Sequence, residues 1–311
     1  MPVHVRQVWA GVQNRKNMEA LYLKGKPQKA QESVDFLRRL PPDLIQGLEP
    51  ATDQQQLCSI LEGVGAKIMD LTKNFPNTSS LEAIHQEKLD DKGKVTDTRD
   101  QKSRYLCLVS GEAQELDFIE YRVDIEGNEV LPKGVPGGFM LTEGFTSAAL
   151  NFHPQYRSES TFRYLGRQSI NGRKTFVVGF AQIPGKAHLS GAFRQGETST
   201  TTFFQGLAWI DTATYQITRL HTELLAPLPE LQLEKEDTDI NIQEVHFNHQ
   251  KETLSLPTEI TVTLDWNRKR FRNRREYSDF RVFSVETGQK IGKPKVAANP
   301  SREPPASSFT R

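Results

Sequence analysis

The sequence has 311 residues, of which 36% are hydrophobic and 25% are charged. This length gives room for one large domain or two small ones with a substantial core. Forty basic and 39 acidic side chains leave a formal net charge of +1, so overall charge gives no reason to expect a nucleic-acid partner. No apolar run of about 18 residues occurs, which excludes a transmembrane segment of helical type.

The first residues, "MPVHVRQVWAGVQNRKNMEALYLKGK", lack the apolar segment of a secretory signal, because charged residues, Gln and Asn break every candidate run. With this start, the sequence predicts a cytoplasmic protein. A start codon assigned too far downstream would leave the same sequence, so both compartments stay open.

Residues 1–50 are expected to form a helical and polar segment of their own. A helical pattern covers residues 16–40 and is interrupted around Gly25 and Pro27. Pro41 and Pro42 then end it, since proline cannot continue a helix and restricts the residue before it.

A second helix is predicted between residues 53 and 75, where apolar residues recur at three- and four-residue steps. Asp53 is the candidate N-cap, and Pro76 lies just beyond the expected end. Gly63 and Gly65 weaken the pattern, because glycine has low helix propensity. The periodic residues are Leu57, Ile60, Leu61, Val64, Ile68 and Leu71.

From about residue 80 the pattern has period 2, which indicates half-buried antiparallel strands. In "ELDFIEYRVDIEGN" the residues Ile119, Tyr121 and Val123 share one face and a Gly-Asn turn follows. "SLEAIHQEKLDDKGKV" and "KSRYLCLVS" predict two further strands before it.

The stretch from residue 132 to Pro154 differs from its neighbours. Its Pro and Gly punctuation gives way to Thr142 as a candidate cap, then to apolar residues at helical spacing from Phe145 to Phe152. We expect a short apolar helix here that packs across the open face of the sheet.

Strands resume at residue 160, joined by Asn171-Gly172, which suits the positive φ angles of a type I′ hairpin. A Gly-rich loop is expected at residues 181–200 and a Pro- and Leu-rich linker at residues 225–237. Strands are then predicted in "TDINIQEVHF", "LPTEITVTLDW" and "YSDFRVFSV".

Counting predicts about nine or ten strands in hairpin order without βαβ alternation, and an antiparallel sheet of that size tends to curl. The expected fold class is mainly β (α+β): a curled antiparallel sheet forming a half-barrel, covered by a few helices. We expect it to span residues 51–290 as one domain. Residues 291–311 have little to bury and are expected to be a disordered tail.

Asp211 in "GLAWIDTATYQITRL" is the first candidate for chemistry. A carboxylate at a strand end can act as a base, but nothing near it in sequence supplies a catalytic partner. Asp is favoured at the first position of a turn, where it accepts backbone N–H groups. We therefore expect a turn residue, and no catalytic residue is assigned.

His246 and His249 form an H-x-x-H pattern that suggests a metal. On a strand this spacing places the two rings on opposite faces, and no third ligand is near in sequence. No metal and no cofactor are predicted; the Gly-rich loop also lacks the spacing of a nucleotide-binding motif.

The run "WNRKRFRNRREY" is the strongest local charge feature. On an extended hairpin arm Arg270, Arg272 and Arg274 would face the same way and could bind an anionic partner. The alternative is a solvated hairpin tip, paired in part with Glu276 and Asp279.

Cys58 and Cys107 are too few for a disulfide framework and lack metal-ligand spacing. Two separate thiols are the simpler expectation. A disulfide between them would be expected only in an oxidising compartment.

Two resemblances follow from these motifs. The order of elements, with a "WIDTATYQITRL" hairpin after a short apolar helix, resembles the half-barrel of periplasmic lipoprotein-carrier proteins of the LolA type and related lipid-sensing domains. Residues 57–290 are also similar to an uncharacterised family of secreted soil-bacterial proteins of acidobacterial type, in "FPNTSS", "YLCL", "FVVGFAQIP", "QGLAWID", "LLAPLPE" and "YSDFRVF".

The carrier resemblance implies an extracytoplasmic, non-enzymatic protein that binds a hydrophobic or lipid-like ligand in a half-barrel cavity. Ordinary core packing is the alternative for each candidate lining residue. Those residues are Phe139, Phe145, Phe152, Phe176, Trp209 and Trp266. The rival functions are an interaction module using the 268–275 arm, and an enzyme whose site joins His221, Glu223 or Asp211 to a nucleophile only in three dimensions.

Overall fold

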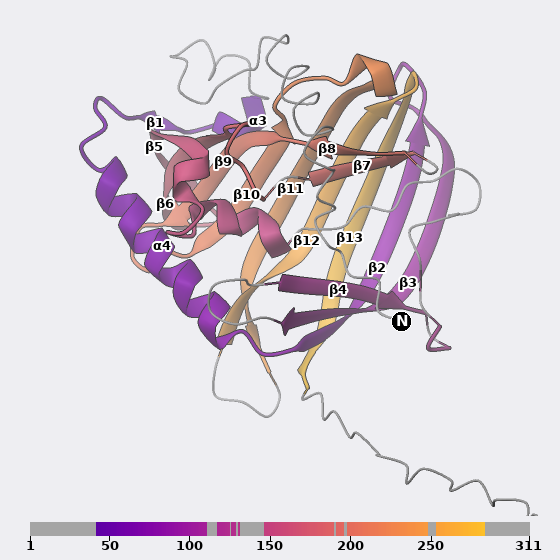
Figure 1. The fold of residues 1–311 in the computed structure, drawn as a ribbon, viewed down its shortest axis with the longest axis horizontal. Helices are drawn as coiled ribbons and strands as arrows, with labels where there is room; N and C mark the ends of the chain where they lie inside the picture. Colours follow the sequence, from indigo (N-terminus) through magenta and orange to yellow (C-terminus); the bar gives the residue numbers. More distant parts are fainter. Residues whose placement is uncertain are drawn as a thin grey trace, which may run out of the picture.

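The computed structural model describes residues 42–110, 117–124, 126–128, 130, 146–189, 191–195, 198–247 and 253–283. These residues form one large antiparallel sheet of 11 strands in the order β1-β5-β6-β9-β10-β11-β12-β13-β2-β3-β4, and a separate pair, β7-β8. The large sheet curls but does not close, since β1 and β4 remain at its two ends (Figure 1). The predicted mainly β half-barrel is confirmed.

The strands of the large sheet are β1 (Glu49–Pro50), β2 (Thr78–Leu89), β3 (Val95–Ser110), β4 (Asp117–Val123), β5 (Ser160–Ile170), β6 (Arg173–Gln182), β9 (Phe204–Asp211), β10 (Ile217–Leu224), β11 (Leu233–His246), β12 (Thr253–Trp266) and β13 (Lys269–Val282). The small pair is β7 (Gly191–Gln195) and β8 (Thr198–Thr202). The helices are α3 (Pro42–Ile45) and α4 (Leu57–Asn74), with 3₁₀ turns η2 (Thr146–Phe152), η3 (Arg157–Glu159) and η4 (Pro229–Leu231).

Most neighbouring strands are also neighbours in sequence, but β13 pairs with β2. In that ladder Arg275 lies opposite Ile84 and Tyr277 opposite Glu82. The C-terminal strand therefore joins the two halves of the sheet, and every pairing in the sheet is antiparallel.

The helix α4 and the turn η2 cover one face of the sheet, which we call the inner face (Figure 1). Ile60 and Val64 of α4 and Phe152 of η2 are buried there against strand residues such as Ile240 and Ile260. The predicted apolar segment across the open face is thus confirmed, as a 3₁₀ turn that begins at Thr146. The position of Thr142 lies outside the described residues.

The start of α4 differs from the prediction. Gln56, not Asp53, is the N-cap residue, and the Asp53 carboxylate accepts a hydrogen bond from the Gln55 backbone N–H at 2.9 Å. Gly63 has a packing reason inside the helix: a Cβ there would lie 2.4 Å from the Tyr215 ring. The glycine that weakens the helical pattern therefore lets α4 approach the β9–β10 hairpin.

Two other expectations about the chain between strands are wrong. The Gly-rich loop at residues 181–200 contains β7 and most of β8, which pair with each other. The linker at residues 225–237 contains the first part of β11, since Leu233 already lies opposite Trp266 of β12. The Asn171-Gly172 turn is confirmed, with φ angles of 50° and 79°.

On the other face of the sheet, which we call the outer face, α3 packs over β5, β6 and β9. Leu44 is buried there against Leu165, Val177 and Trp209. Gln168 accepts a hydrogen bond from Trp209 Nε1 at 2.6 Å and donates to the Gln46 carbonyl at 2.8 Å. Residues 42–50 therefore pack against the sheet. The domain boundaries expected near residues 50 and 290 stay predictions.

The predicted helix at residues 16–40 and the tail at 291–311 lie outside the described residues. Within the described part of the chain, no helix is long and apolar enough to cross a membrane.

Candidate functional site: an apolar pocket beside a buried ion-pair network

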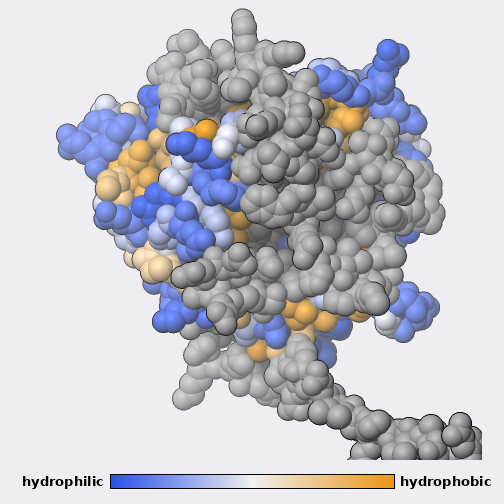
Figure 2. Space-filling view, viewed as in Figure 1, coloured by the Kyte–Doolittle hydropathy of each residue, from blue (hydrophilic) through white to orange (hydrophobic). Residues whose placement is uncertain are grey.

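A pocket opens between the end of α4 and the inner face of β2, β3, β12 and β13. Its empty space is about 370 Å³, counted with the part open to solvent. It is lined by Phe75, Thr78, Ser80, Tyr105, Cys107, Leu256, Pro257, Ile260, Tyr277 and Phe280. Figure 2 shows apolar surface near the lower edge of the view, in the region where Figure 1 places the end of α4 and the ends of β12 and β13.

Strand alternation explains why these side chains meet. Thr78 and Ser80 are two residues apart on β2 and lie opposite Cys107 and Tyr105 of β3. Residues two apart on a strand share a face, so all four point to the inner face. Phe75, the residue that directly follows α4, closes one end of the pocket.

The chemistry of the lining is mostly apolar. Phe75, Leu256, Ile260 and Phe280 supply aromatic and aliphatic walls, and hydroxyl or thiol groups supply the few polar atoms. A concave, mainly apolar space with a few polar groups is typical of sites for small hydrophobic molecules.

Directly beside the pocket lies a buried ion-pair network centred on Glu82 of β2. Its Oε2 accepts hydrogen bonds from Arg122 Nε at 2.6 Å and Ser103 Oγ at 3.0 Å. Its Oε1 accepts from Arg122 Nη2 at 3.0 Å, Arg275 Nη1 at 2.9 Å and Tyr277 Oη at 2.8 Å. The side chains of Glu82 and Arg275 are fully buried.

The electrostatics of the network fix the charge of Glu82. Burial alone would raise the pKa of this carboxyl, but the charges of Arg122 and Arg275 outweigh burial and lower the pKa to about 2. Burial also raises the pKa of Tyr277 and of Tyr105, so both phenols stay protonated. Glu82 is therefore ionised at neutral pH, where it accepts the hydrogen bond of the Tyr277 hydroxyl.

The network orients two walls of the pocket. Tyr105 and Tyr277 contact each other with ring centroids 5.3 Å apart. The Arg122 guanidinium lies 5.1 Å from the centre of the Tyr105 ring, and the Tyr277 hydroxyl is bound to Glu82. Charged groups of the network thus contact both aromatic rings and fix their orientation.

The four predicted cavity residues that the structure describes do not line this pocket. Phe152 and Phe176 lie in the main core of the inner face, whereas Trp209 is buried on the outer face. Trp266 packs against Phe193 in a second cluster. Phe139 and Phe145 lie outside the described residues. A ligand role for these six side chains stays a prediction, but Phe152 and Trp209 cannot line one cavity.

The three arginines of the 268–275 arm share the outer face of β13, the second strand of the β12–β13 hairpin. This strand also pairs with β2 along its other edge. Arg270 forms a bidentate pair with Asp265 at 2.6 and 2.7 Å. Arg272 pairs with Glu87, whose oxygen is also 3.7 Å from Arg274. The predicted partners Glu276 and Asp279 are not the ones that these arginines contact, so anion binding here stays a prediction.

Cys58 and Cys107 are not joined by a disulfide. Cys58 is exposed near the start of α4, whereas Cys107 is buried in the pocket wall. A bond would need the two sulfur atoms in contact. The structure has two separate thiols, of which only Cys107 is buried.

Asp211 is the turn residue that the sequence predicts. Its Oδ1 accepts hydrogen bonds from the backbone N–H groups of Ala213 and Thr214 at 2.8 and 2.9 Å. The Asp211 carboxylate thus stabilises the β9–β10 turn through these two hydrogen bonds.

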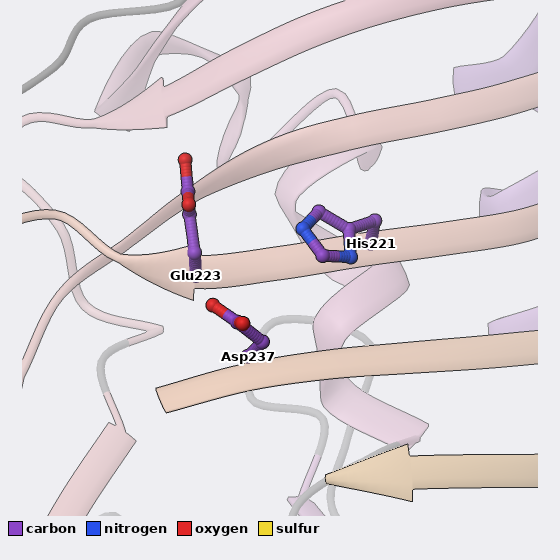
Figure 3. Close-up of side chains that lie close together, drawn as sticks. All are labelled: His221, Glu223 and Asp237. Carbon is purple, nitrogen blue, oxygen red and sulfur yellow. The ribbon is translucent and has the colours of Figure 1, made fainter. Parts of the chain in front are cut away.

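Other groups that could hold a metal lie on the outer face. His221, Glu223 and Asp237 place one potential ligand atom each within 4.8 Å of one another (Figure 3). Of the H-x-x-H pattern, for which no metal is predicted, only His246 is described, because His249 lies outside the described residues. The sequence singled out His221 and Glu223, but it assigned Asp237 to a linker and so missed the third group.

No family model matches this sequence, and no curated protein matches it. Among solved structures, one similar chain is a DUF1329 family protein from Desulfovibrio piger, with 10% identity and a TM-score of 0.39 over 72% of this chain and 92% of that one. Another is a putative outer membrane lipoprotein-sorting protein domain from Vibrio parahaemolyticus, with 11% identity and a TM-score of 0.39 over 73% and 94%. Likeness at this level does not say what this chain binds, and the likeness to secreted soil-bacterial proteins stays a prediction.

Proposed function

We propose that this protein binds a hydrophobic, lipid-like ligand in the pocket between α4 and the inner face of the half-barrel. The observation that carries the proposal is the pocket lining: aromatic and aliphatic walls that meet at Tyr105 and Tyr277. The role is that of a carrier or sensor, without a catalytic step.

The position and the lining of the pocket support this role. Its space of about 370 Å³ includes the part open to solvent, so a bound ligand would lie partly at the surface. The pocket lies at the end of α4 and is partly open to solvent, so an elongated apolar chain can enter there. Burying each CH₂ group of such a chain stabilises the complex by about 0.8 kcal/mol.

The ion-pair network gives the pocket a fixed shape. Because Glu82 holds the Tyr277 hydroxyl and Arg122 lies over the Tyr105 ring, the two rings do not have to be ordered when a ligand binds. A preformed wall lowers the entropic cost of binding. The motif likeness to lipoprotein carriers supports an extracytoplasmic location as part of the same proposal.

The two cysteines allow a direct test. In a Cys58→Ser protein the remaining thiol is Cys107, which lines the pocket. We expect a long-chain fatty acid to slow the reaction of Cys107 with N-ethylmaleimide by about tenfold, since a ligand in the pocket shields the thiol. A fatty acid that leaves the rate unchanged would contradict the proposal.

The matched control is a Cys107→Ser protein. Its Cys58 is exposed on α4, so the fatty acid should not alter its reaction rate. Native mass spectrometry of protein purified from its own host complements the rate measurement, and an apolar ligand that dissociates on denaturation is the expected result.

A further inference from the structure

Four side chains meet on the outer face of β10 and β11, away from the pocket. His221 and Glu223 are two residues apart on β10 and so share a face. His221 lies directly opposite Asp239 of β11, and Glu223 directly opposite Asp237. An antiparallel ladder thus brings one imidazole and three carboxylates together, and Figure 3 shows the His221 ring and the carboxylates of Glu223 and Asp237 gathered around one space.

One nitrogen of His221 lies close to Asp239 without a hydrogen bond between them. The distance between His221 Nδ1 and Asp239 Oδ1 is 3.3 Å, and the same oxygen accepts a hydrogen bond from Arg219 Nη2 at 2.8 Å. Nε2 is then left for a ligand, and among the described residues it has no hydrogen-bond partner. The His221 residue as a whole is only 4% exposed. A histidine whose other nitrogen contacts a carboxylate is the usual arrangement of a metal ligand.

The two carboxylates also keep one oxygen each. Glu223 Oε1 accepts a hydrogen bond from Gln205 Nε2 at 3.1 Å, which leaves Oε2. Asp237 Oδ2 pairs with Lys235, whereas Oδ1 is buried without a hydrogen-bond partner among the described residues. The buried Gln205 Oε1 also lacks a donor there. Asp237 Oδ1 and Gln205 Oε1 are thus two neighbouring buried acceptors without donors, and such atoms are commonly satisfied by a water or an ion.

From this geometry we propose that His221, Glu223 and Asp237 bind a divalent transition-metal ion of the zinc type. Imidazole with carboxylate oxygen suits zinc and its neighbours, whereas magnesium and calcium prefer oxygen ligands alone. Three protein ligands leave a position for water, as in open zinc sites.

The spacing is close to what such an ion requires. Ligand atoms at about 2.0 to 2.1 Å from a tetrahedral zinc ion lie about 3.3 Å from each other. The three atoms lie within 4.8 Å of one another, so rotation of the Glu223 and Asp237 side chains can close the site. Lys235 is half exposed and can keep Asp237 Oδ2 while the ion takes Oδ1.

The test is a titration of untagged, chelator-treated full-length protein with zinc chloride by calorimetry. We expect one equivalent to bind with a dissociation constant below about 100 µM, which corresponds to about 5.5 kcal/mol. Binding to the folded state should also raise the melting temperature. Cobalt(II) should produce a visible absorption band, whereas magnesium should not compete.

Two variants locate the site. His221→Gln and Asp237→Asn should each weaken zinc binding by at least about tenfold. The matched control is His85→Gln, because His85 also lies on the outer face beside two carboxylates, at 2.7 Å from Asp100 and 3.6 Å from Glu87. That variant should bind zinc like the wild type.

Absence of binding below about 100 µM would overturn the proposal. So would equal loss of binding in His85→Gln, or full retention in both His221→Gln and Asp237→Asn. If His221→Gln does not fold by circular dichroism, Asp237→Asn decides, since Asp237 is less deeply buried than His221.

Discussion

Arg275 and Glu82 form a fully buried ion pair at 2.9 Å although 193 residues separate them in the sequence. The pair lies on the β13–β2 ladder that joins the two halves of the sheet. It therefore connects the order of the pocket wall to the pairing that joins the two halves of the sheet.

Removing one member of the pair should be costly. Arg275→Met leaves Glu82 with less compensation in the interior, and breaking a buried pair typically costs about 3 to 5 kcal/mol. We expect a loss of that order in the free energy of unfolding, measured by urea denaturation. The control Arg274→Met removes the next arginine, which is exposed and 3.7 Å from Glu87, and should change stability by less than about 1 kcal/mol. Equal effects of the two variants would contradict this role of Arg275.

The low pKa of Glu82 predicts acid sensitivity. Its folded-state pKa is about 2, against an ordinary value of 4.5, so the ionised form stabilises the fold above pH 4.5. That stability is lost as pH falls from 4.5 towards 2, and the full shift is worth about 3 kcal/mol. Glu82→Gln should flatten the decrease in unfolding free energy over this pH range. An unchanged slope in the variant would rule out Glu82 as its source.

The local patterns of the sequence located most elements, because strand alternation and turn chemistry depend on neighbours in the chain. The Asn171-Gly172 and Asp211 turns are examples. The β13–β2 pairing was not predictable in this way, since no local pattern says which distant strand a segment meets. Arg275 therefore looked like one charge in a solvated basic run, while its partner Glu82 lies on another strand.

The candidate sites depend on the same non-local information. The pocket takes residues from the end of α4 and from four strands, so no single segment carries its signature. Trp209 looked equivalent to Phe176 by hydrophobicity, but the pleat places the two on opposite faces of the sheet. Asp237 was not recognised as a strand residue because "PLPE" suggested a linker. In the structure β11 already begins at Leu233.

Glu236 predicts the opposite pH dependence to Glu82. Burial, and next the charge of Asp237, raise the pKa of Glu236 to about 7. A carboxyl with a raised pKa stabilises the fold below pH 4.5, and this contribution is lost as pH rises through 7. Glu236→Gln should therefore raise the melting temperature at pH 8 relative to the wild type, by an amount equivalent to about 1 to 2 kcal/mol after allowance for solvent screening. At pH 4 the two proteins should melt alike; a variant less stable at pH 8 would contradict the assignment.

Gly206 should be essential for the approach of β9 to β10. A Cβ at this position would lie 1.9 Å from the His221 carbonyl oxygen, which is backbone and cannot turn away. Gly206→Ala should destabilise the protein by more than about 2 kcal/mol in urea denaturation, because the two strands must separate. Gly185→Ala is the control, since nothing lies within 4 Å of a Cβ there. Tolerance of alanine at both positions would show that the ladder can shift.

Filling the pocket tests the binding function by a second route. Ser80 lines the pocket from β2, so Ser80→Leu places an isobutyl group in the space that the ligand would occupy. We expect fatty-acid affinity, measured by displacement of a fluorescent fatty-acid probe, to fall by at least about tenfold, or about 1.4 kcal/mol. Ala83→Leu adds a similar side chain to the same strand but on the outer face, three residues away, and should leave the affinity unchanged. Equal affinities in both variants would place the ligand outside this pocket, whereas loss in Ser80→Leu alone would locate it between α4 and the Tyr105–Tyr277 wall.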